Sequence, residues 1–400
     1  MLNRRHLMAS MAAFAASPAT AEPVAVRRRL ILVLADGGWD TTMGLDPKLG
    51  IAGVDGPEVD EDPDIADDVE SVETYNGIDI ATNVFKRPSV DRFFSTWGSR
   101  CTVIRGLWTG SLAHGPAMDR VVTGAWPDQP DVAVRVGAAG TSPLGTVDLT
   151  GLSRPGPLAG RLTRLGASGQ IRGLVDPKLL PSAIGTTSKW TPSASDDADI
   201  ATWLHARRNG LATGVASWDK GHLENLSDAD ARMRTLDGWT PGAVTSDTLA
   251  GDGVIVANLM LAGLCDAAVL TSRVTWDTHS DNSRQHRSHD TLFAGLGFLA
   301  QTLDGAGLLD SVVVAVMSEL ARTPWLNTDL GKDHWPWTAA LVFGGGVRGS
   351  EVLGATDNKM AGLPVDGELI TYDRVVAGLL EAAGVDPSIS FPTTQPLSLG

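Results

Sequence analysis

The stretch RLILVLADGGWD at residues 29–40 joins a continuous apolar run to an aspartate and two glycines. An unbroken apolar run of this length predicts a strand buried on both faces, as in a parallel sheet covered by helices. Polar residues that follow such strands gather at the carboxyl edge of the sheet, where open α/β folds place their sites. Similar apolar runs lie at 101–104, 267–270, 312–317 and 339–343.

Segments with helical periodicity separate these runs. Apolar residues recur at three- and four-residue spacing in 252–264, 288–303 and 372–383, which predicts amphipathic helices. Strands that alternate with helices indicate an α/β fold, with a doubly wound and mostly parallel sheet flanked by helices. We therefore expect a single α/β domain over residues 22–400.

Two regions interrupt the alternation of strands and helices. The segment at about 46–80 is rich in Asp, Glu, Gly and Pro and predicts an acidic surface insertion. A calcium-binding loop is the alternative there, although the segment has no EF-type ligand spacing. Residues from about 125 to 250 are rich in Gly, Pro, Ser and Thr and contain few clear strands, so we interpret them as an irregular, cap-like insertion.

The first 21 residues have the pattern of an export signal. Arg4 and Arg5 form a twin-arginine region, a short apolar stretch follows, and Ala19-Thr20-Ala21 is a small-residue cleavage site. The apolar stretch is too short to span a bilayer. We predict a periplasmic or extracellular protein that is exported folded by the twin-arginine route and has no stable membrane insertion.

The composition narrows the classes of partner and site. A net charge of −15 argues against nucleic acid or an anionic membrane as the partner, because phosphate binding needs clustered Lys and Arg. With only Cys101 and Cys265 present, any metal site has to use His, Asp and Glu. The sequence leaves open whether these two thiols pair and which oligomeric state the protein adopts.

Acidic and imidazole side chains follow the predicted strands. Asp36 comes directly after the first run, so it is either a site residue or a turn and helix-capping residue. Asp277 and His279 stand two apart, a spacing that turns both side chains the same way in an extended chain. His286 and His289 follow at helical i, i+3 spacing, which places three of the eight histidines within eleven residues.

A second group of candidates lies near the last predicted strands. Glu319 follows the run at 312–317, where it is either held by a cation or paired locally with Arg322. Asp333 and His334 lie in a loop rich in Gly, Pro and Trp. This mixture of oxygen and imidazole donors suits one or two divalent metal ions, with zinc, manganese, iron and calcium all open.

The order of these segments resembles the alkaline phosphatase/sulfatase superfamily. More closely, TWDTHSDN at 275–282, SELARTPWLN at 318–327 and GKDHW at 331–335 are similar to an uncharacterised family of exported proteins placed in that superfamily. The resemblance implies an alkaline phosphatase-like fold with metal ligands at Asp36, Asp277, His279, Glu319 and His334. Possible further ligands are Asp281, His286 and Asp333.

Two positions depart from the superfamily pattern. Leu320 follows Glu319 where a second histidine ligand is usual, which implies a single metal or a rebuilt two-metal centre. His114 stands nine residues before Thr123-Gly124, where the resemblance implies the nucleophile. His114 is therefore a candidate metal ligand, general acid or base, or nucleophile, and a helix-capping role is the structural alternative.

Together these features predict a metal-dependent hydrolase of phosphate or sulfate esters, in which Arg120 or Arg322 neutralises the anion. Seven of the twelve Trp residues lie in or beside the site segments, which favours a small-molecule or glycan ester as substrate. The alternative is a non-catalytic binding protein for an extracellular glycan or a cell-surface partner. The absence of Ser, Thr or Cys at the nucleophile position favours that alternative.

Overall fold

The computed structural model describes residues 27–125, 128–165, 193–212, 220–221, 223–224, 227 and 247–400. Its strands are β1 (Arg29–Leu34), β2 (Ser71–Tyr75), β3 (Ile78–Thr82), β4 (Cys101–Trp108), β5 (Thr146–Asp148), β6 (Leu162–Arg164), β7 (Ala267–Thr271), β8 (Val312–Met317), β9 (Ala321–Arg322), β10 (His334–Trp335), β11 (Trp337–Gly344), β12 (Glu351–Leu353) and β13 (Ile370–Thr371). Its α-helices are α1 (Pro88–Trp97), α2 (His114–Thr123), α3 (Val132–Ala139), α5 (Ala194–Ala212), α7 (Leu249–Leu261), α8 (Arg284–Gly305) and α9 (Tyr372–Ala382).

Among the described residues, a central sheet of nine strands has the order β12-β4-β11-β8-β1-β7-β5-β6, with β13 paired to β4. β1 lies between β7 and β8 and is parallel to both, with Leu32 opposite Val269 and Ala315. β11 is antiparallel to β4 and β8, and the other pairs of this sheet are parallel. The carboxyl ends of β1, β4, β7 and β8 therefore meet at one edge.

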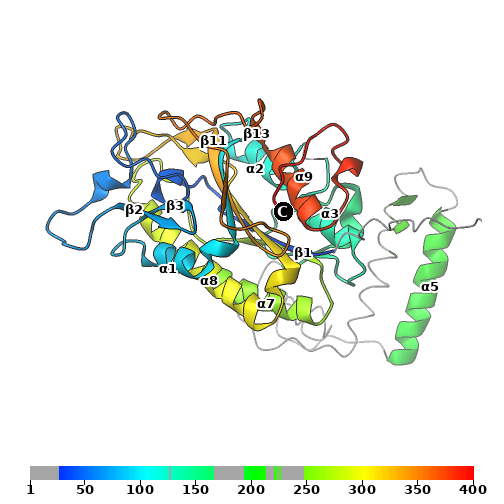
Figure 1. Ribbon diagram of the computed structural model, residues 1–400. Helices are drawn as coiled ribbons and strands as arrows, with labels where there is room; N and C mark the ends of the chain where they lie inside the picture. The colour runs from blue at the N-terminus through cyan, green and yellow to red at the C-terminus, as the bar shows by residue number, and fades with distance from the viewer. Residues whose placement is uncertain are drawn as a thin grey trace, which may run out of the picture.

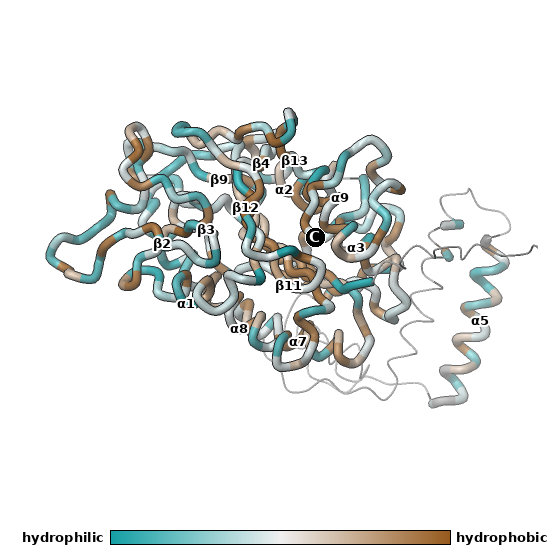
Figure 2. Tube along the Cα trace, in the orientation of Figure 1, coloured by the Kyte–Doolittle hydropathy of each residue, from teal (hydrophilic) through white to brown (hydrophobic). Residues whose placement is uncertain are grey.

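Helices cover both faces of this sheet (Figure 1). α1, α7 and α8 share a core with Ile31 and Val33, whereas α2, α3 and α9 share a core with Leu30 and Leu32. The alternation within β1 explains the two cores, because successive side chains of a strand point to opposite faces. Figure 2 shows apolar residues concentrated along the central strands, as a sheet covered on both faces requires.

The predicted fold class is confirmed, since a mostly parallel sheet lies between two helical layers. The helices predicted at 252–264, 288–303 and 372–383 correspond to α7, α8 and α9, with bounds that differ by a few residues. The direction of β11 was not evident from the sequence, because a buried apolar run reads the same in either orientation.

The two insertions differ in their relation to the central sheet. The acidic insertion contains the antiparallel hairpin of β2 and β3, which is separate from the central sheet. Within the region interpreted as a cap, β5 and β6 instead extend the central sheet beyond β7. Strands of three residues are too short to show a periodic pattern, which is why they were missed. The predicted signal segment 1–21 lies outside the described residues.

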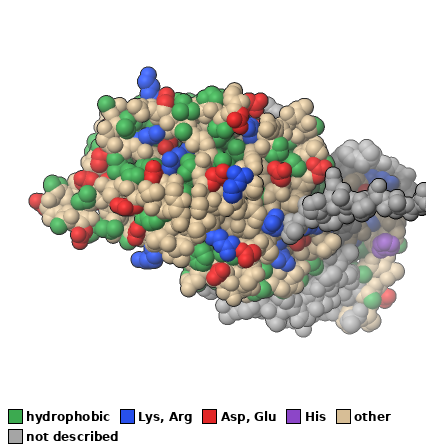
Figure 3. Space-filling model, viewed as in Figure 1, with side chains coloured by type: hydrophobic (Ala, Val, Ile, Leu, Met, Phe, Trp, Pro, Cys, Tyr) green, Lys and Arg blue, Asp and Glu red, His purple; other side chains and the backbone are tan. Residues whose placement is uncertain are grey.

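Among the described helices, none combines the length and apolar character needed to span a membrane. On the face shown in Figure 3, Lys and Arg side chains are dispersed among Asp and Glu side chains. Cys101 and Cys265 are buried free thiols, and burial raises the pKa of both.

Candidate metal centre

Loops at the carboxyl edge of the sheet carry the candidate ligands. Asp36 follows β1, Asp277 and His279 follow β7, and Glu319 follows β8. Because β1 is parallel to β7 and to β8, these loops leave the sheet on the same side. The parallel strands thus bring Asp36 close to Glu319, although the two residues are 283 positions apart in the sequence.

Two shorter elements bring further histidines to this edge. β10 pairs with β9, so that His334 lies opposite Arg322, three residues after Glu319. α2 begins at His114, after the loop that follows β4. The His114 and His334 rings approach each other with centroids 4.3 Å apart.

Two glycines let the loop after β1 pack closely on the segments that follow β7 and β8. Gly37 and Gly38 have φ angles of +121° and +82°, which favour glycine. A Cβ on Gly37 would lie 2.9 Å from the backbone nitrogen of Asp277. Gly37 therefore allows the close approach to the loop after β7, whereas a Cβ on Gly38 would lie 3.3 Å from Nε of Arg322, after β8.

Glu319 is fully buried and fixes the His114 ring. Its Oε1 accepts hydrogen bonds from Nδ1 of His114 at 2.7 Å and from the backbone N–H of Gly37 at 2.8 Å. The hydrogen bond to Glu319 raises the pKa of His114. Because a carboxylate only accepts, Nδ1 carries the proton and Nε2 of the neutral ring carries a lone pair. That Nε2 is buried without a hydrogen-bond partner, 3.8 Å from Oδ2 of Asp277.

Two further imidazoles are held through Nδ1. His334 donates to the backbone oxygen of Leu112 at 2.7 Å, and His279 donates to Oδ1 of Asp333 at 2.9 Å. The Nε2 atoms of His279 and His334 face each other at 3.0 Å. When both rings are neutral and carry their proton on Nδ1, the lone pairs of their two Nε2 atoms face each other. Either an additional proton on one Nε2 or a cation between them has to satisfy these lone pairs. Partial burial lowers the pKa of His334. An additional proton on this ring is therefore disfavoured, which leaves a cation as the favoured partner of the two Nε2 atoms.

Asp277 is the carboxylate on which the three rings converge. Its Oδ1 lies 3.1 Å from Nε2 of His279 and 3.8 Å from Nε2 of His334. One ligand atom each from His114, Asp277 and His334 lie within 4.8 Å of one another. Imidazoles that are fixed by outer acceptors and surround a carboxylate fit a transition metal ion.

Arg322 holds Asp277 in place, and its buried side chain cannot contact a ligand. Its side chain is 0% exposed, and its Nη2 donates to Oδ1 of Asp277 at 2.6 Å. The guanidinium also donates to three backbone oxygens of the neighbouring loops. Although partial burial raises the pKa of Asp277, the bond to Arg322 outweighs it and lowers that pKa. Arg322 therefore pairs with Asp277, whereas a local pair with Glu319 was one of the two alternatives that the sequence left open.

Asp36 lies at the exposed rim of this cluster. Partial burial of the carboxyl and the nearby Glu319 raise the pKa of Asp36, while His114 lowers it. Neighbouring carboxylates are most stable beside a cation. Asp36 thus adds to the preference of this region for a positive ion.

Asp281 and His286 are not brought to the cluster. Asp281 accepts hydrogen bonds from the backbone and hydroxyl of Ser283 just before α8. His286 is buried, with Nδ1 against the guanidinium of Arg87 and Nε2 3.4 Å from Oδ2 of Asp60. Both were predicted as possible further ligands, but the chain turns into α8 here and directs them elsewhere.

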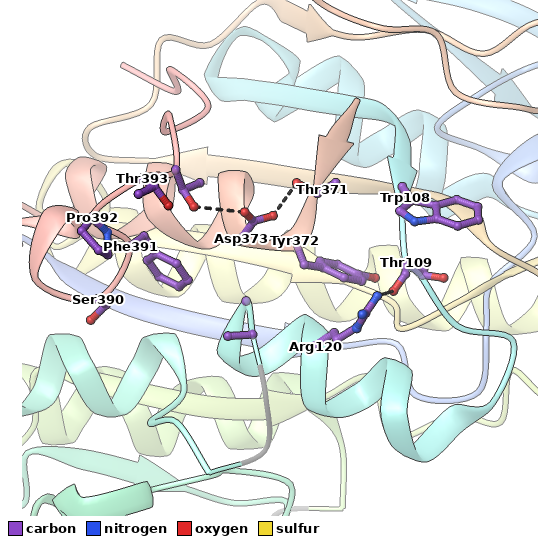
Figure 4. Close-up of a pocket in the computed structure, with 13 residues that line it drawn as sticks. Trp108, Thr109, Arg120, Thr371, Tyr372, Asp373, Ser390, Phe391, Pro392 and Thr393 are labelled. Carbon is purple, nitrogen blue, oxygen red and sulfur yellow. Dashed lines mark hydrogen bonds between the residues drawn. The ribbon is translucent and has the colours of Figure 1, made fainter. Parts of the chain in front are cut away.

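Arg120 lines a separate pocket (Figure 4). Its Nη1 donates to the backbone oxygen of Thr109 at 3.2 Å. Arg120 lies six residues after His114 in α2, so the two side chains serve different places. We therefore do not place Arg120 among the groups of the candidate metal centre.

A buried ion pair that sequence reasoning missed fixes the loop before His334. Nζ of Lys332 lies 2.7 Å from Oδ2 of Asp40, and both side chains are 1% exposed. The amide of Asn282 donates to the same oxygen, and the backbone N–H of Lys332 donates to Thr278. The sequence carried one indication of this ion pair. Asp40 and Lys332 have opposite charges and lie in two motifs that were expected to meet, LADGGWD and GKDHW.

Residues 196–398, just over half of the chain, match the family described as Protein of unknown function (DUF1501). The chain belongs to this family. The match includes the loops after β7 and β8, whereas Asp36 and His114 precede it. Membership confirms the uncharacterised family that the motifs predicted. A comparison with curated proteins gave no match.

Several solved structures resemble this fold at low identity. Ps i-CgsB in complex with k-i-k-neocarrahexaose has 10% identity and a TM-score of 0.42, covering 92% of this chain and 77% of that chain. The lipoteichoic acid synthase LtaP from Listeria monocytogenes has 10% identity and a TM-score of 0.40, covering 91% and 73%. The phosphonate monoester hydrolase SpPMH from Silicibacter pomeroyi has 9% identity and a TM-score of 0.39, covering 93% and 76%. These likenesses are too distant to assign an activity.

Proposed function

We propose that the protein is an exported hydrolase of phosphate or sulfate esters that depends on a divalent metal ion. One observation carries the proposal: three imidazole Nε2 atoms converge on Asp277 while each Nδ1 donates to a fixed acceptor. Proteins use this pattern around metal ions, because the outer acceptor sets the direction and the tautomer of the ring. The proposed ligands are His114, Asp277, His279 and His334.

The donor set favours a transition ion over calcium. Three imidazoles and one carboxylate suit zinc, manganese or iron, whereas calcium prefers an all-oxygen shell. When bound, such an ion supplies a Lewis acid that polarises the ester and lowers the pKa of water. Leu320 is fully buried in the position after Glu319, which supports a single ion.

Four groups around the ligands keep them in position. Glu319, Asp333 and the backbone oxygen of Leu112 each hold one imidazole, and Arg322 holds Asp277. Because the Arg322 side chain is fully buried, it cannot touch the substrate. We therefore assign Arg322 a positioning role in place of direct anion binding, and Glu319 an orienting role in place of metal ligation.

The geometry argues against His114 as a covalent nucleophile. Glu319 holds its Nδ1, and its Nε2 is directed at Asp277. The hydroxyls of Thr109 and Ser111 donate to backbone oxygens of their own loop. We infer that water attacks the phosphorus or sulfur atom of the ester while Asp36 accepts a proton from that water. The bond from this atom to the alcohol oxygen breaks, and the alcohol leaves with a proton taken up from solvent. In this proposal Asp36 is a base at the rim and not a direct ligand.

The exposed Trp325 and its half-buried neighbour Trp335 support a carbohydrate as the alcohol of the ester. Trp325 is 48% exposed, and its ring centroid lies 5.4 Å from that of Trp335, which directly follows His334. An indole offers an apolar face and one N–H donor, a combination that suits a sugar. Export by the twin-arginine route rests on the motif in residues 1–21.

Metal binding and turnover test the proposal separately. Calorimetric titration of chelator-treated protein with Zn²⁺, Mn²⁺ and Fe²⁺ should show about one ion per chain. Asp277→Ala and His334→Ala should weaken binding by at least about 100-fold. The matched controls are Asp64→Ala and His205→Ala, which remove an exposed Asp and an exposed His and should leave binding unchanged.

Ester hydrolysis is then measured on an aryl phosphate and an aryl sulfate. Metal-dependent turnover of either ester that both ligand variants abolish supports the proposal. Unchanged metal binding in both ligand variants contradicts the assigned site. Metal binding without turnover of either ester contradicts the hydrolase and supports the non-catalytic binding protein.

A further inference from the structure

A cavity of about 450 Å³ lies between the end of α2, the start of α9 and the segment 390–394 (Figure 4). Trp108, which ends β4, and Thr371, which ends β13, both line it. β13 is parallel to β4, and β4 and β8 are both antiparallel to β11, so the three strands end at the same edge. The cavity therefore lies at the same edge of the sheet as the candidate metal centre, where such sheets place their ligands.

The lining combines apolar rings with many hydroxyls. Trp108 and Phe391 contribute aromatic rings, and Thr371, Ser390, Thr393 and Thr394 contribute hydroxyl groups. A hydroxyl both donates and accepts, so this lining suits a ligand that is itself rich in hydroxyls. The volume falls within the roughly 300–1,000 Å³ of small-molecule sites.

The charges in the lining balance. Arg120 brings one guanidinium and Asp373 one carboxylate, and Asp373 accepts hydrogen bonds from the hydroxyls of Thr371 and Thr394. Asp373 also stands in the first turn of α9, the position that an anionic ligand would favour. A phosphate or carboxylate ligand would meet that negative charge. The cavity therefore favours an uncharged polar ligand.

Two elements connect the cavity to the metal centre. α2 starts with His114 at the centre and carries Arg120 into the cavity. Tyr372 lines the cavity, and its hydroxyl donates to the backbone oxygen of Ser318, next to Glu319. None of the four proposed ligands lines the cavity, but α2 and the hydrogen bond of Tyr372 link it to the residues around them.

We propose that this cavity binds an uncharged sugar residue. Rings on Trp108 and Phe391 pack against the apolar face of the sugar, while Arg120, Asp373 and the lining hydroxyls bind its hydroxyl groups. Within the proposed function, which this step assumes, the sugar belongs to the alcohol part of the ester. Binding of the free sugar does not depend on that function.

The test uses saturation-transfer NMR and calorimetry on chelator-treated full-length protein. The probes are the methyl glycosides of glucose, galactose, mannose and N-acetylglucosamine. Arg120→Met removes the positive charge from the lining. Thr393→Trp places a larger side chain in the cavity from an exposed position of the lining. If only one of the two variants folds, that variant still tests the proposal. Matched controls are Arg348→Met and Thr96→Trp, both exposed and absent from the lining.

We expect at least one glycoside to bind, with affinity reduced about tenfold or more in both cavity variants and unchanged in the controls. Failure of all four glycosides to bind overturns the proposal, as does binding that the folded cavity variants leave intact. Binding of inorganic phosphate with exclusion of the glycosides also overturns it. Aryl ester turnover is scored separately, so its absence beside sugar binding refutes the proposed hydrolase and leaves this cavity assignment standing.

Discussion

At the scale of single residues, Glu319 connects the strand edge to the candidate metal centre. Its buried carboxylate accepts hydrogen bonds from Gly37 and from His114, so one side chain sets both the first loop and one imidazole. A buried carboxylate needs such donors, because an unpaired charge is costly in the interior. The outer acceptor of a metal-bound histidine also sets its basicity.

Replacing Glu319 by Gln tests this connection. Glu319→Gln keeps the shape and one acceptor oxygen but removes the charge that stabilises the His114 N–H. We expect metal affinity to fall about 10- to 100-fold, measured by calorimetry on folded protein. Glu381→Gln, at an exposed position in α9, is the matched control. Equal affinity in the wild type and Glu319→Gln would show that Glu319 does not act through His114.

Asp36 separates proton transfer from metal binding. Asp36→Asn removes the proposed base at the rim and leaves the proposed ligands in place. We expect turnover of the aryl ester to fall about 10²- to 10⁴-fold while metal affinity changes less than about threefold. Loss of metal together with turnover would instead make Asp36 a ligand, as the superfamily resemblance implied.

At the scale of elements, the buried pair of Lys332 and Asp40 ties the loop before β10 to the loop after β1. Burial raises the pKa of Asp40, but Lys332 and several hydrogen bonds outweigh it and lower that pKa. Lys332→Met leaves a buried carboxylate without its cation, so we expect unfolding to become easier by about 3–5 kcal/mol in urea titrations.

A second substitution checks that the loss comes from the pair. Lys332→Met combined with Asp40→Asn removes the unpaired charge and should recover at least about 1 kcal/mol relative to Lys332→Met alone. Lys359→Met, at an exposed lysine, should be neutral. Strictly additive losses in the double variant would argue that the two residues act independently.

The elements also show how far the sequence predicts this fold. Unbroken apolar runs located β1, β7 and β8, and their parallel pairing brought Asp36, Asp277 and Glu319 to one edge as expected. The side on which α8 presents His286 depends on packing against Arg87, which lies 199 positions away and which spacing cannot reveal. Similarly, the place of Arg120 depends on how α2 meets α9. The meeting of residues that follow strands was therefore predictable, whereas the direction of helix-borne side chains was not.

At the scale of the whole molecule, a buried histidine couples the core to pH. His289 stacks on Trp39 and Phe293, and its Nε2 lies 3.0 Å from the backbone oxygen of Asp40. Burial and the nearby Arg87 lower the pKa of His289 to about 3. The unfolded chain takes up this proton near pH 6.5 and the folded chain does not, so stability falls as pH falls from about 6.5 toward 3.

The variant His289→Phe isolates this contribution. Unfolding free energies are measured in urea between pH 7 and pH 5, with chelator present. The advantage of the wild type over His289→Phe should shrink by roughly 2 kcal/mol across that range. A difference that stays constant with pH would mean that His289 is protonated equally in the folded and unfolded chain.

We propose that one metal ion lies among the three converging imidazoles. Anomalous scattering from crystals grown with Zn²⁺ tests it most directly, with data collected on both sides of the zinc absorption edge. We expect one strong peak about 2.0–2.2 Å from Nε2 of His114, His279 and His334 and from a carboxylate oxygen of Asp277. Crystals that bind zinc only at other positions would contradict this assignment.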